Sequence, residues 1–264
     1  MNEFLELESH GRVLRLVMNR PDKRNALSSK LCRELVDAFN HANHDLSVGA
    51  IVLAANGPSF CAGMDLHEVG HIDSDSLSHL HDQLFTIGSR LTKPLVAAVD
   101  GPALGGGMGL AANGHIVVAS SRAQFGLTEI RIGLWPFLVY RAVDNALGAR
   151  RTLELALTGR IFDAAEARAM MLVQVIDEDP NGKAMEIAMD LAAASPTAIR
   201  SGLNYVQETR GKDWEMAGMV GRYAREELFQ SADFQEGLRA FREKRKPEWP
   251  SLAHVNQYPG DKTP

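Results

Sequence analysis

The apolar positions of the first 45 residues follow a strand-like pattern at first and a helix-like pattern after it. Apolar and polar residues alternate over residues 4–8 and 12–18, on either side of His10 and Gly11, which predicts a half-buried hairpin. Behind Ser28, a suitable helix cap, apolar residues recur at helical spacing at Leu31, Leu35, Val36 and Phe39. The chain is therefore expected to begin with two strands followed by an amphipathic helix.

Two short runs of uninterrupted apolar residues follow. They are AIVLAA at residues 50–55 and LVAAV at residues 95–99, and such runs are typical of strands covered on both faces. Between them a helix ending before Pro94 is predicted by the apolar positions Leu77, Leu80, Leu84, Ile87 and Leu91. Further strands are expected at residues 115–120 and 123–125. This alternation of strands and helices favours an α/β architecture.

The balance shifts to helices beyond Leu147. Residues 173–177 form the main strand-like exception, and helices are expected over residues 182–194, 196–208 and 214–246. We expect residues 1–195 to form the α/β core, residues 196–250 a helical C-terminal assembly region, and residues 251–264 a frayed tail.

Composition narrows the class of protein. Of the 264 residues, 45% are hydrophobic and 23% charged, as in soluble globular proteins. The formal charge of −5 argues against nucleic-acid binding, and no apolar run is long enough to span a membrane. The two cysteines, Cys32 and Cys61, have no metal-binding spacing, and the acidic residues of MNEFLELESH are unlike a signal peptide, so none is expected. A cytoplasmic protein is expected.

Two turns that follow the buried strands could stabilise negative charge. In FCAGMDL (residues 60–66) Gly63 permits a sharp turn, and Met64 and Asp65 are expected to open a helix. The glycine-rich GPALGGGMGL (residues 101–110) also leads into a predicted helix. Backbone amides at such turns could converge on one oxygen and form an oxyanion hole. Alternatively, both turns are only tight connections.

The segment His67-Glu68-Val69-Gly70-His71 matches the HExxH pattern of zinc peptidases. That pattern needs a stable helix and a third ligand. Gly70 weakens the helix and no third ligand follows at the usual spacing. A zinc metallopeptidase is therefore a remote alternative, a solvated helix face is favoured, and no metal is expected.

Five segments together resemble the crotonase superfamily, the enoyl-CoA hydratase and isomerase family, from about Phe4 to Trp249. In family order they are NRPDKRNALS (19–28), FCAGMDL (60–66), GPALGGG (101–107), AQFGLTEIRIG (123–133) and EGLRAFREKRKP (236–247). The resemblance implies a spiral of ββα units with a helical C-terminal trimerisation region. It also implies a homotrimer or hexamer whose substrate is an acyl-CoA thioester. No cofactor is implied, because coenzyme A is part of the substrate.

The resemblance also implies the site residues. The backbone amides of Met64 and Gly106 would form the oxyanion hole. The acyl pocket would include Trp135, Pro136 and Phe137. Substrate and coenzyme A would contact Lys23, Arg24, Ala26, Ala62, Asp65, Leu66, Phe241 and Lys244. In the family the last segment often reaches the coenzyme from a neighbouring subunit, whereas Arg245 and Lys246 are expected to form a solvated helix end.

The chain departs from the hydratase pattern at one position. Hydratases of this family use two glutamates; one of those positions is Gly109 here, and the other is retained as Glu129. Adding water suits two carboxylates, whereas moving a double bond from the 3 to the 2 position needs a single acid/base. Residues 133–137 also resemble the family's mitochondrial-type isomerases. We therefore expect a Δ3-Δ2 enoyl-CoA isomerase with Glu129 as the catalytic residue.

Other reactions stay open at this point. A hydratase or another crotonase-type lyase could recruit a substitute carboxylate from Asp65 or Glu68. Dienoyl-type isomerases and dehalogenating members need an additional aspartate, whose positions hold Gly109 and either Phe137 or Val143. A non-catalytic acyl-CoA-binding protein is a further alternative.

Overall fold

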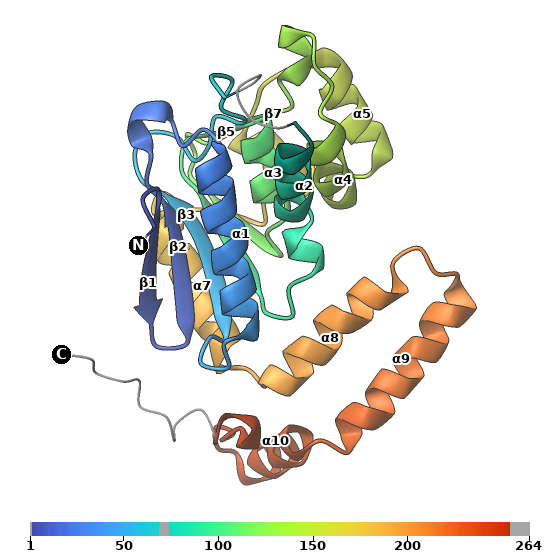
Figure 1. The fold of residues 1–264 in the computed structure, drawn as a ribbon. Helices are drawn as coiled ribbons and strands as arrows, with labels where there is room; N and C mark the ends of the chain where they lie inside the picture. The colour runs from blue at the N-terminus through green and yellow to red at the C-terminus, as the bar shows by residue number, and fades with distance from the viewer. Residues whose placement is uncertain (1, 69–73, 254–264) are drawn as a thin grey trace, which may run out of the picture.

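The core of the computed structural model, which describes residues 2–68 and 74–253, is a six-stranded sheet (Figure 1). Its order is β1 (Leu5–His10), β2 (Val13–Met18), β3 (Ala50–Ala55), β4 (Leu95–Val99), β6 (Ile116–Ala119) and β9 (Val175–Ile176). Only the β1–β2 hairpin is antiparallel; each later pair is parallel. The carboxyl ends of the parallel strands therefore meet at one edge of the sheet.

Helices cover both faces of this sheet. On one face α7 (Pro180–Ala193) packs its alanines against Val52, Val96 and their neighbours. On the other face α1 (Ser29–His44) belongs to the larger core, together with Ile51 and Leu53. Successive residues of β3 therefore enter different cores, which explains why its apolar run is uninterrupted.

A smaller three-stranded sheet and a group of helices lie above the core in Figure 1. The strands are β5 (Pro102–Leu104), β7 (Gln124–Gly126) and β8 (Phe162–Asp163). The helices are α2 (Ser74–Phe85), α3 (Gly106–Ala112), α4 (Phe137–Leu147), α5 (Ala149–Thr158) and α6 (Ala164–Ala169). Short 3₁₀ helices are η1 (Pro21–Lys23), η2 (Ile87–Ser89), η3 (Glu129–Ile132) and η4 (Pro250–Leu252).

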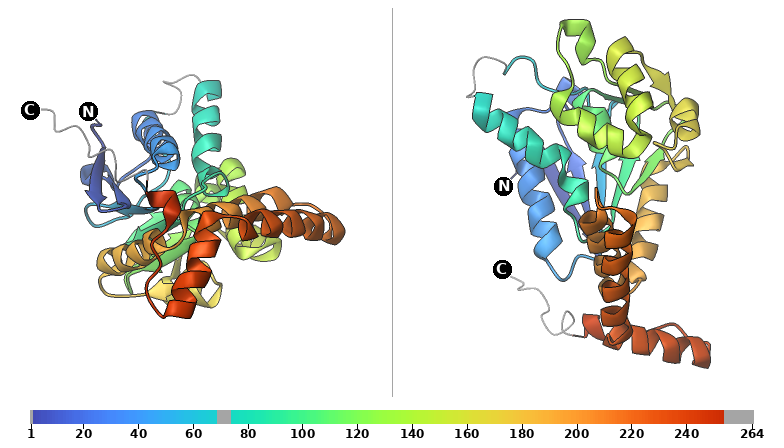
Figure 2. Two further views of the ribbon diagram at one scale, coloured as in Figure 1. Left: turned by 90° about the horizontal axis from the view of Figure 1, so that it is seen from below. Right: turned by 90° about the vertical axis from the view of Figure 1, so that its right-hand side faces the viewer.

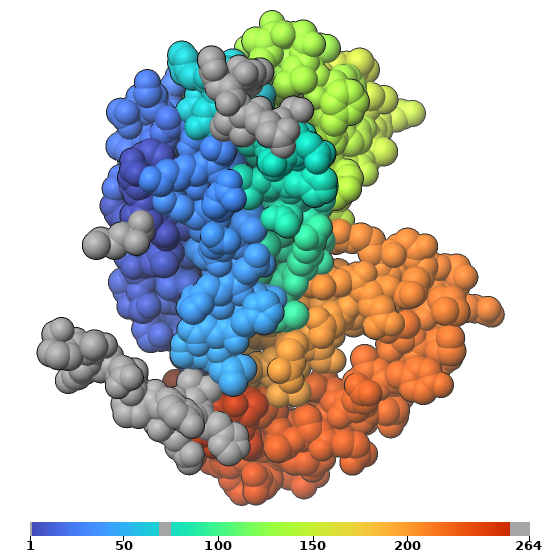
Figure 3. Space-filling model, in the orientation of Figure 1, coloured from blue at the N-terminus to red at the C-terminus, as the bar shows by residue number. Residues whose placement is uncertain are grey.

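The C-terminal helices form an arm that projects from the core (Figures 1 and 2). It consists of α8 (Pro196–Thr209), α9 (Trp214–Phe229) and α10 (Ala232–Glu243). Neither α8 nor α9 contains a buried residue; α8 touches the core, where Gln207 donates to the Leu91 carbonyl at 2.7 Å, whereas α9 lies on the outer side of the arm (Figure 3). The predicted α/β architecture with a helical C-terminal region is confirmed, and α8 begins at the expected boundary.

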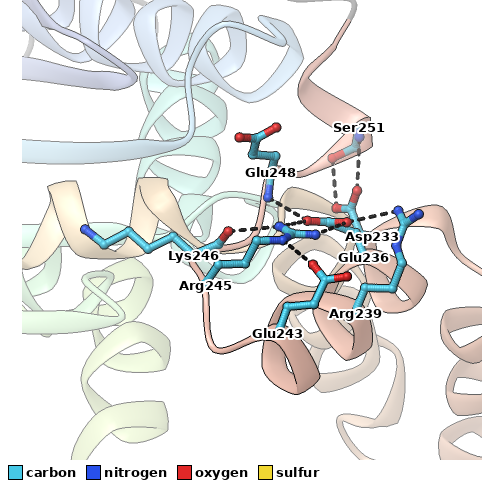
Figure 4. A network of polar contacts seen from close by, with 8 residues as sticks. All are labelled: Asp233, Glu236, Arg239, Glu243, Arg245, Lys246, Glu248 and Ser251. Atoms are coloured by element: carbon cyan, nitrogen blue, oxygen red, sulfur yellow. Dashed lines mark hydrogen bonds and ion pairs between the residues drawn. The ribbon is translucent and has the colours of Figure 1, made fainter.

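Charged residues hold the end of α10 in place (Figure 4). Arg245 makes two hydrogen bonds to the carboxylate of Glu236, at 2.6 and 3.2 Å, and Arg239 makes another at 2.9 Å. Hydrogen bonding to Arg245 lowers the pKa of Glu236 to about 2. Arg245 is exposed just beyond the end of α10, as expected of a solvated helix end, and its partner Glu236 lies within that helix.

Four expected helix or strand bounds differ from the structure. The helix of residues 77–91 ends at Phe85, where the side chain of Asn113 donates to the carbonyl of Phe85 at 3.1 Å. Residues 214–246 form two helices, because Ser231 accepts a hydrogen bond from Phe234 N–H and starts α10. The strand expected at residues 173–177 shortens to β9. No helix begins at Met64; instead, Met64 and Leu27 form an isolated parallel β-bridge.

Within the described ranges, no helix combines the length and the hydropathy that a bilayer crossing requires.

Candidate active site

Four of the segments singled out in the sequence meet around a cavity of about 530 Å³. Its walls come from the turn at residues 62–66, the start of α3, the segment around η3 and the start of α4, with α2 closing one side. A larger cavity of about 750 Å³ lies between the core and α8, but it contains no residue of the predicted site. The chemistry is therefore expected in the smaller cavity.

The two turns expected to carry an oxyanion hole lie side by side. The N–H of Leu104 donates to the carbonyl of Cys61 at 2.9 Å, and Cys61 N–H donates to Pro102 at 3.1 Å. Gly63 has a φ of 95°, and a β-carbon there would lie 3.0 Å from the Leu104 carbonyl oxygen and 3.4 Å from the Gly106 nitrogen. Only glycine permits both this conformation and this close approach.

The amides of Met64 and Gly106 are free to bind a ligand oxygen. Gly106 is the first residue of α3, so no carbonyl within the helix can accept from its N–H. Among residues 2–68 and 74–253, neither this N–H nor that of Met64 donates to an acceptor. Both residues line the cavity, as an oxyanion hole requires.

Glu129 lines the same cavity beside the glycine turn. The parallel pairing of β5 with β7 places Gly105 next to Gly126, and Gly105 N–H donates to the Gly126 carbonyl at 2.8 Å. The chain then enters η3, and the Glu129 carboxylate packs so closely that a β-carbon at Gly105 would lie 3.0 Å from its Oε1. Glu129 Oε2 is buried and has no hydrogen-bond partner among the described residues. Burial raises the pKa of Glu129, which makes it a better proton carrier near neutral pH.

The position of the missing second glutamate is closed by apolar side chains. A β-carbon at Gly109 would lie 2.7 Å from Cγ1 of Val139 and 3.1 Å from Cδ1 of Phe85. Carbon atoms in good contact are about 3.5–4.0 Å apart, so a side chain does not fit there without displacing one of these residues. The absence of a carboxylate at position 109 is thus built into the packing.

The turn at residues 21–27 is held against the cavity wall by a buried asparagine. Asn25 donates to the carbonyls of Asn56 and Ser59, both at 2.9 Å, and accepts from Arg20 N–H at 2.8 Å. In addition, Ala62 N–H donates to the Arg24 carbonyl at 3.0 Å.

These contacts determine where the predicted coenzyme-binding residues lie. Lys23 and Arg24 are exposed beside this turn and Ala26 is half-buried, but none of the three lines the cavity. Ala62 and Leu66 do line it.

Asp65, predicted to contact substrate, has a buried side chain in an ion pair with Arg20 at 2.6 Å. It is absent from the cavity lining, and hydrogen bonding to Arg20 contributes to lowering its pKa against the opposing effect of burial. Asp65 therefore stabilises the turn and is not placed to act as a substitute catalytic carboxylate.

The predicted acyl-pocket residues Trp135, Pro136 and Phe137 all line the cavity. Trp135 stacks on Tyr140 with ring centroids 6.2 Å apart, which fixes its orientation, whereas the side chain of Phe137 is 72% exposed at the mouth. Their role in binding an acyl chain remains a prediction.

Of the HExxH segment the structure describes only His67 and Glu68, and neither lies in a helix. His67 and Glu68 lie in a turn before α2, and His71 lies outside the described residues. Glu68 is already used, because its Oε2 accepts from Ser29 N–H at 2.7 Å at the start of α1. The described part of the chain contains no group of three or more histidines, cysteines, aspartates or glutamates that could hold a metal. The described residues of the expected solvated helix face, His67 and Glu68, are not helical, and the rest of it lies outside the described residues.

Phe241 and Lys244 lie at the end of α10, at the opposite side of the chain from η3 and α2 (Figure 1). Both are exposed, Phe241 by 84%. One chain by itself does not bring them to the cavity.

Three polar residues that line the cavity were not predicted from the sequence: Ser78, Thr128 and His81, of which only His81 has a ring. Leu77, His81 and Phe85 follow one another at a spacing of four, so they share a helix face, and all three line the cavity. A histidine in an otherwise apolar stripe of this spacing was the available signal.

Comparison with known proteins agrees with the geometry. Residues 8–252 match the family model for enoyl-CoA hydratase/isomerase. The chain is 34% identical to enoyl-CoA hydratase EchA19 of Mycobacterium tuberculosis, over 92% of this chain and 95% of that protein. It is 33% identical to the 2,3-dehydroadipyl-CoA hydratase of Escherichia coli, over 94% and 99% respectively.

The fold matches solved structures as well. The enoyl-CoA hydratase of Mycobacterium smegmatis superposes with a TM-score of 0.88 at 29% identity, over 94% of this chain and 99% of that one. An enoyl-CoA hydratase/isomerase of Marinobacter aquaeolei gives a TM-score of 0.86 at 26% identity, over 93% and 98%. The predicted crotonase-like fold is confirmed, and the chain belongs to the enoyl-CoA hydratase/isomerase family of the crotonase superfamily.

Proposed function

We propose that this family member is a Δ3-Δ2 enoyl-CoA isomerase that uses Glu129 as its single acid/base. One observation carries the proposal: Glu129 lines the cavity with an unpartnered Oε2, while Val139 and Phe85 fill the position of a second carboxylate at Gly109. The remaining cavity carboxylate, Glu68, is bound to the first turn of α1.

The reaction needs one base and one site for negative charge. Glu129 takes a proton from C2 of the 3-enoyl thioester, and the negative charge moves onto the thioester oxygen as an enolate. The amides of Met64 and Gly106 donate hydrogen bonds to that oxygen. Protonated Glu129 then gives its proton to C4, the double bond shifts from C3–C4 to C2–C3, and the enolate oxygen becomes the thioester carbonyl again. No proton is gained or lost overall.

The environment of Glu129 suits this shuttle. Glu129 acts first as a base and then, holding the proton that it took from C2, as an acid. Burial raises the pKa of Glu129, so its carboxylate is a stronger base towards C2 than an ordinary carboxylate. Its Oε2 is buried and has no hydrogen-bond partner among the described residues.

Hydration of a 2-enoyl thioester is the second candidate, and the names of the relatives favour it. That reaction requires water to be positioned and deprotonated while C2 receives a proton. Of the two substitute carboxylates considered, Asp65 is paired with Arg20 and Glu68 holds Ser29. Both arrangements count against hydration as the main activity.

Coenzyme binding and assembly form part of the proposal. Lys23 and Arg24 are exposed on the turn of residues 21–27, which is next to the cavity because Ala62 N–H donates to the Arg24 carbonyl. Cations at this place could meet the phosphates of coenzyme A. Phe241 and Lys244 could reach that coenzyme only from another copy of the chain. A homotrimer or hexamer would supply this copy and would also cover exposed surface of α8 and α9, which contain no fully buried residue within one chain. Cytoplasmic location stays a prediction.

A panel of CoA thioesters tests the reaction. We expect the wild-type protein to convert 3-enoyl thioesters to 2-enoyl thioesters faster than it hydrates 2-enoyl or dehydrates 3-hydroxyacyl thioesters. Glu129→Gln keeps the shape of the side chain but cannot accept a proton at neutral pH, so isomerisation should fall by about 10²–10⁴-fold. Glu68→Gln should lose much less.

Two results would contradict the proposal. Unchanged isomerisation in Glu129→Gln would remove the proposed acid/base. Hydration as fast as isomerisation in the wild-type protein would assign the site to water chemistry.

A further inference from the structure

The stripe of Leu77, His81 and Phe85 on α2 places a histidine in the wall of the acyl cavity. His81 is only 7% exposed. Its ring lies against that of Phe85, with centroids 5.7 Å apart and planes at 45°. The imidazole is therefore held by packing within the site, away from bulk solvent.

His81 Nε2 is buried and has no hydrogen-bond partner among the described residues. Among the described residues that line this cavity, the only other atom of this kind is Oε2 of Glu129. Proton transfer accounts for the unpartnered Oε2 of Glu129, but the proposed isomerisation has no use for Nε2 of His81. Buried polar atoms in native proteins almost always have a partner, so this atom points to a ligand group.

The imidazole is neutral at pH 7. Burial lowers the pKa of His81 from an ordinary value already below 7, although the nearby Glu68 carboxylate acts in the opposite direction. In a neutral imidazole one ring nitrogen donates and the other accepts. Nε2 can thus pair with a donor or with an acceptor, according to its tautomer.

The charges around the cavity select among possible partners. The described lining residues include the carboxylates of Glu68 and Glu129 but no lysine or arginine. A carboxylate on the acyl chain would be repelled and would have no cation to meet. A ketone could only accept a hydrogen bond. A hydroxyl is neutral and can both donate and accept, so it satisfies either tautomer.

We propose that the natural substrate carries a hydroxyl group on its acyl chain, hydrogen-bonded to Nε2 of His81. This inference deepens the proposed function and rests on its acyl-CoA site. A chain without the hydroxyl would leave Nε2 unpaired in a filled, dry cavity. A site built to hydrogen-bond a substrate hydroxyl rejects the analogue that lacks it, so we expect a preference of at least about tenfold.

Binding of saturated acyl-CoA thioesters tests the inference without any turnover. The series keeps one chain length and carries no substituent or a single hydroxyl at successive carbons from C4. Matched keto and terminal carboxylate thioesters complete it, and titration calorimetry gives each dissociation constant. In the wild-type protein, one hydroxylated thioester should bind at least about tenfold more tightly than the unsubstituted chain.

Variants on the same helix assign the preference to His81. His81→Leu should abolish it and bind the unsubstituted chain at least as well as the wild-type protein does. Its fold should persist, because removing an unpartnered polar group from an apolar site is nearly neutral. His81→Gln, which keeps a polar group, should retain part of the preference. His79→Leu is the matched control, since His79 is exposed on α2 and should keep the full preference.

The inference is overturned if no hydroxyl position is preferred, if the keto or carboxylate chain binds most tightly, or if His81→Leu keeps the wild-type ratio. A water molecule held by His81 would give that last result. These outcomes are independent of catalysis. A failure of Glu129→Gln to stop isomerisation would refute the proposed function while leaving this binding result intact.

Discussion

Replacing Gly109 with alanine tests whether Val139 and Phe85 occupy the space of a second carboxylate. The new methyl carbon would lie 2.7 Å from Val139 Cγ1, well inside the contact distance of about 3.5–4.0 Å. Val139 is buried on α4, and a β-branched side chain in a helix has almost no alternative rotamer. Either the backbone that carries the new methyl group or the Val139 side chain must therefore move.

Two opposing contributions determine the size of the effect. Alanine in place of glycine inside a helix such as α3 adds about 1 kcal/mol to the free energy of unfolding. Overpacking removes about 1–3 kcal/mol. We expect Gly109→Ala to lower the free energy of unfolding by up to about 2 kcal/mol, which is the difference between these two ranges. With Val139→Ala already present, the same substitution should raise it by up to about 1 kcal/mol.

Guanidinium unfolding of the wild-type protein, the two single variants and the double variant measures the coupling between positions 109 and 139. This coupling free energy should be about 1–3 kcal/mol. Protein concentration must be equal throughout, because assembly would contribute to apparent stability. Gly202→Ala on α8 is the control, since a β-carbon there would meet nothing within 4 Å. A coupling near zero, or stabilisation by Gly109→Ala equal to that by Gly202→Ala, would refute the packing argument. By the same geometry, Gly109→Glu alone should confer no hydratase activity.

Three further predictions concern pH. Because burial raises the pKa of Glu129, the kcat/KM for isomerisation should fall as pH drops through that raised pKa. At pH values above the raised pKa, Glu129→Gln should have a larger free energy of unfolding than the wild-type protein, because it buries no charge; at pH 3 this difference should be absent. Isomerisation assays at a series of pH values measure the kcat/KM profile, and urea unfolding at the same pH values measures the stability difference. A stability difference that does not change with pH would contradict the prediction for Glu129→Gln. Arg245 lowers the pKa of Glu236 to about 2, so stability of the α10 end should be present above pH 4.5 and be lost as pH falls towards 2. Hydrogen exchange of α10 amides should show this loss, and Arg245→Met should make the pH step smaller, because Arg239 and Glu248 N–H still bind Glu236; an identical step in the variant would argue against the pair.

Much of the fold follows from local pattern. Alternation over residues 4–18 predicted the hairpin, and Ser28 does cap α1 by accepting from Leu31 N–H. Such features depend on neighbours a few positions apart, so spacing and residue type suffice. Where a distant residue intervenes, the prediction failed: α2 ends at Phe85 because Asn113 binds its last carbonyl.

The candidate site shows the same division. The family motifs located Glu129, Met64 and Gly106, and the absence of a glutamate at Gly109 pointed to a single acid/base. Motif matching could not show that Asp65 and Glu68 are used elsewhere, by Arg20 and by the start of α1. Their partners lie about 40 residues away in the chain.

The sequence by itself determined the order of strands and helices, the family and the carboxylate on which the reaction depends, because these reside in residue type and local spacing. Only the tertiary structure decided which groups share one cavity. Strand order places the turns at Gly63 and Gly106 side by side, and packing of α2 and α4 closes position 109 and turns His81 inward. Those contacts join segments that are distant along the chain, so no local pattern encodes them.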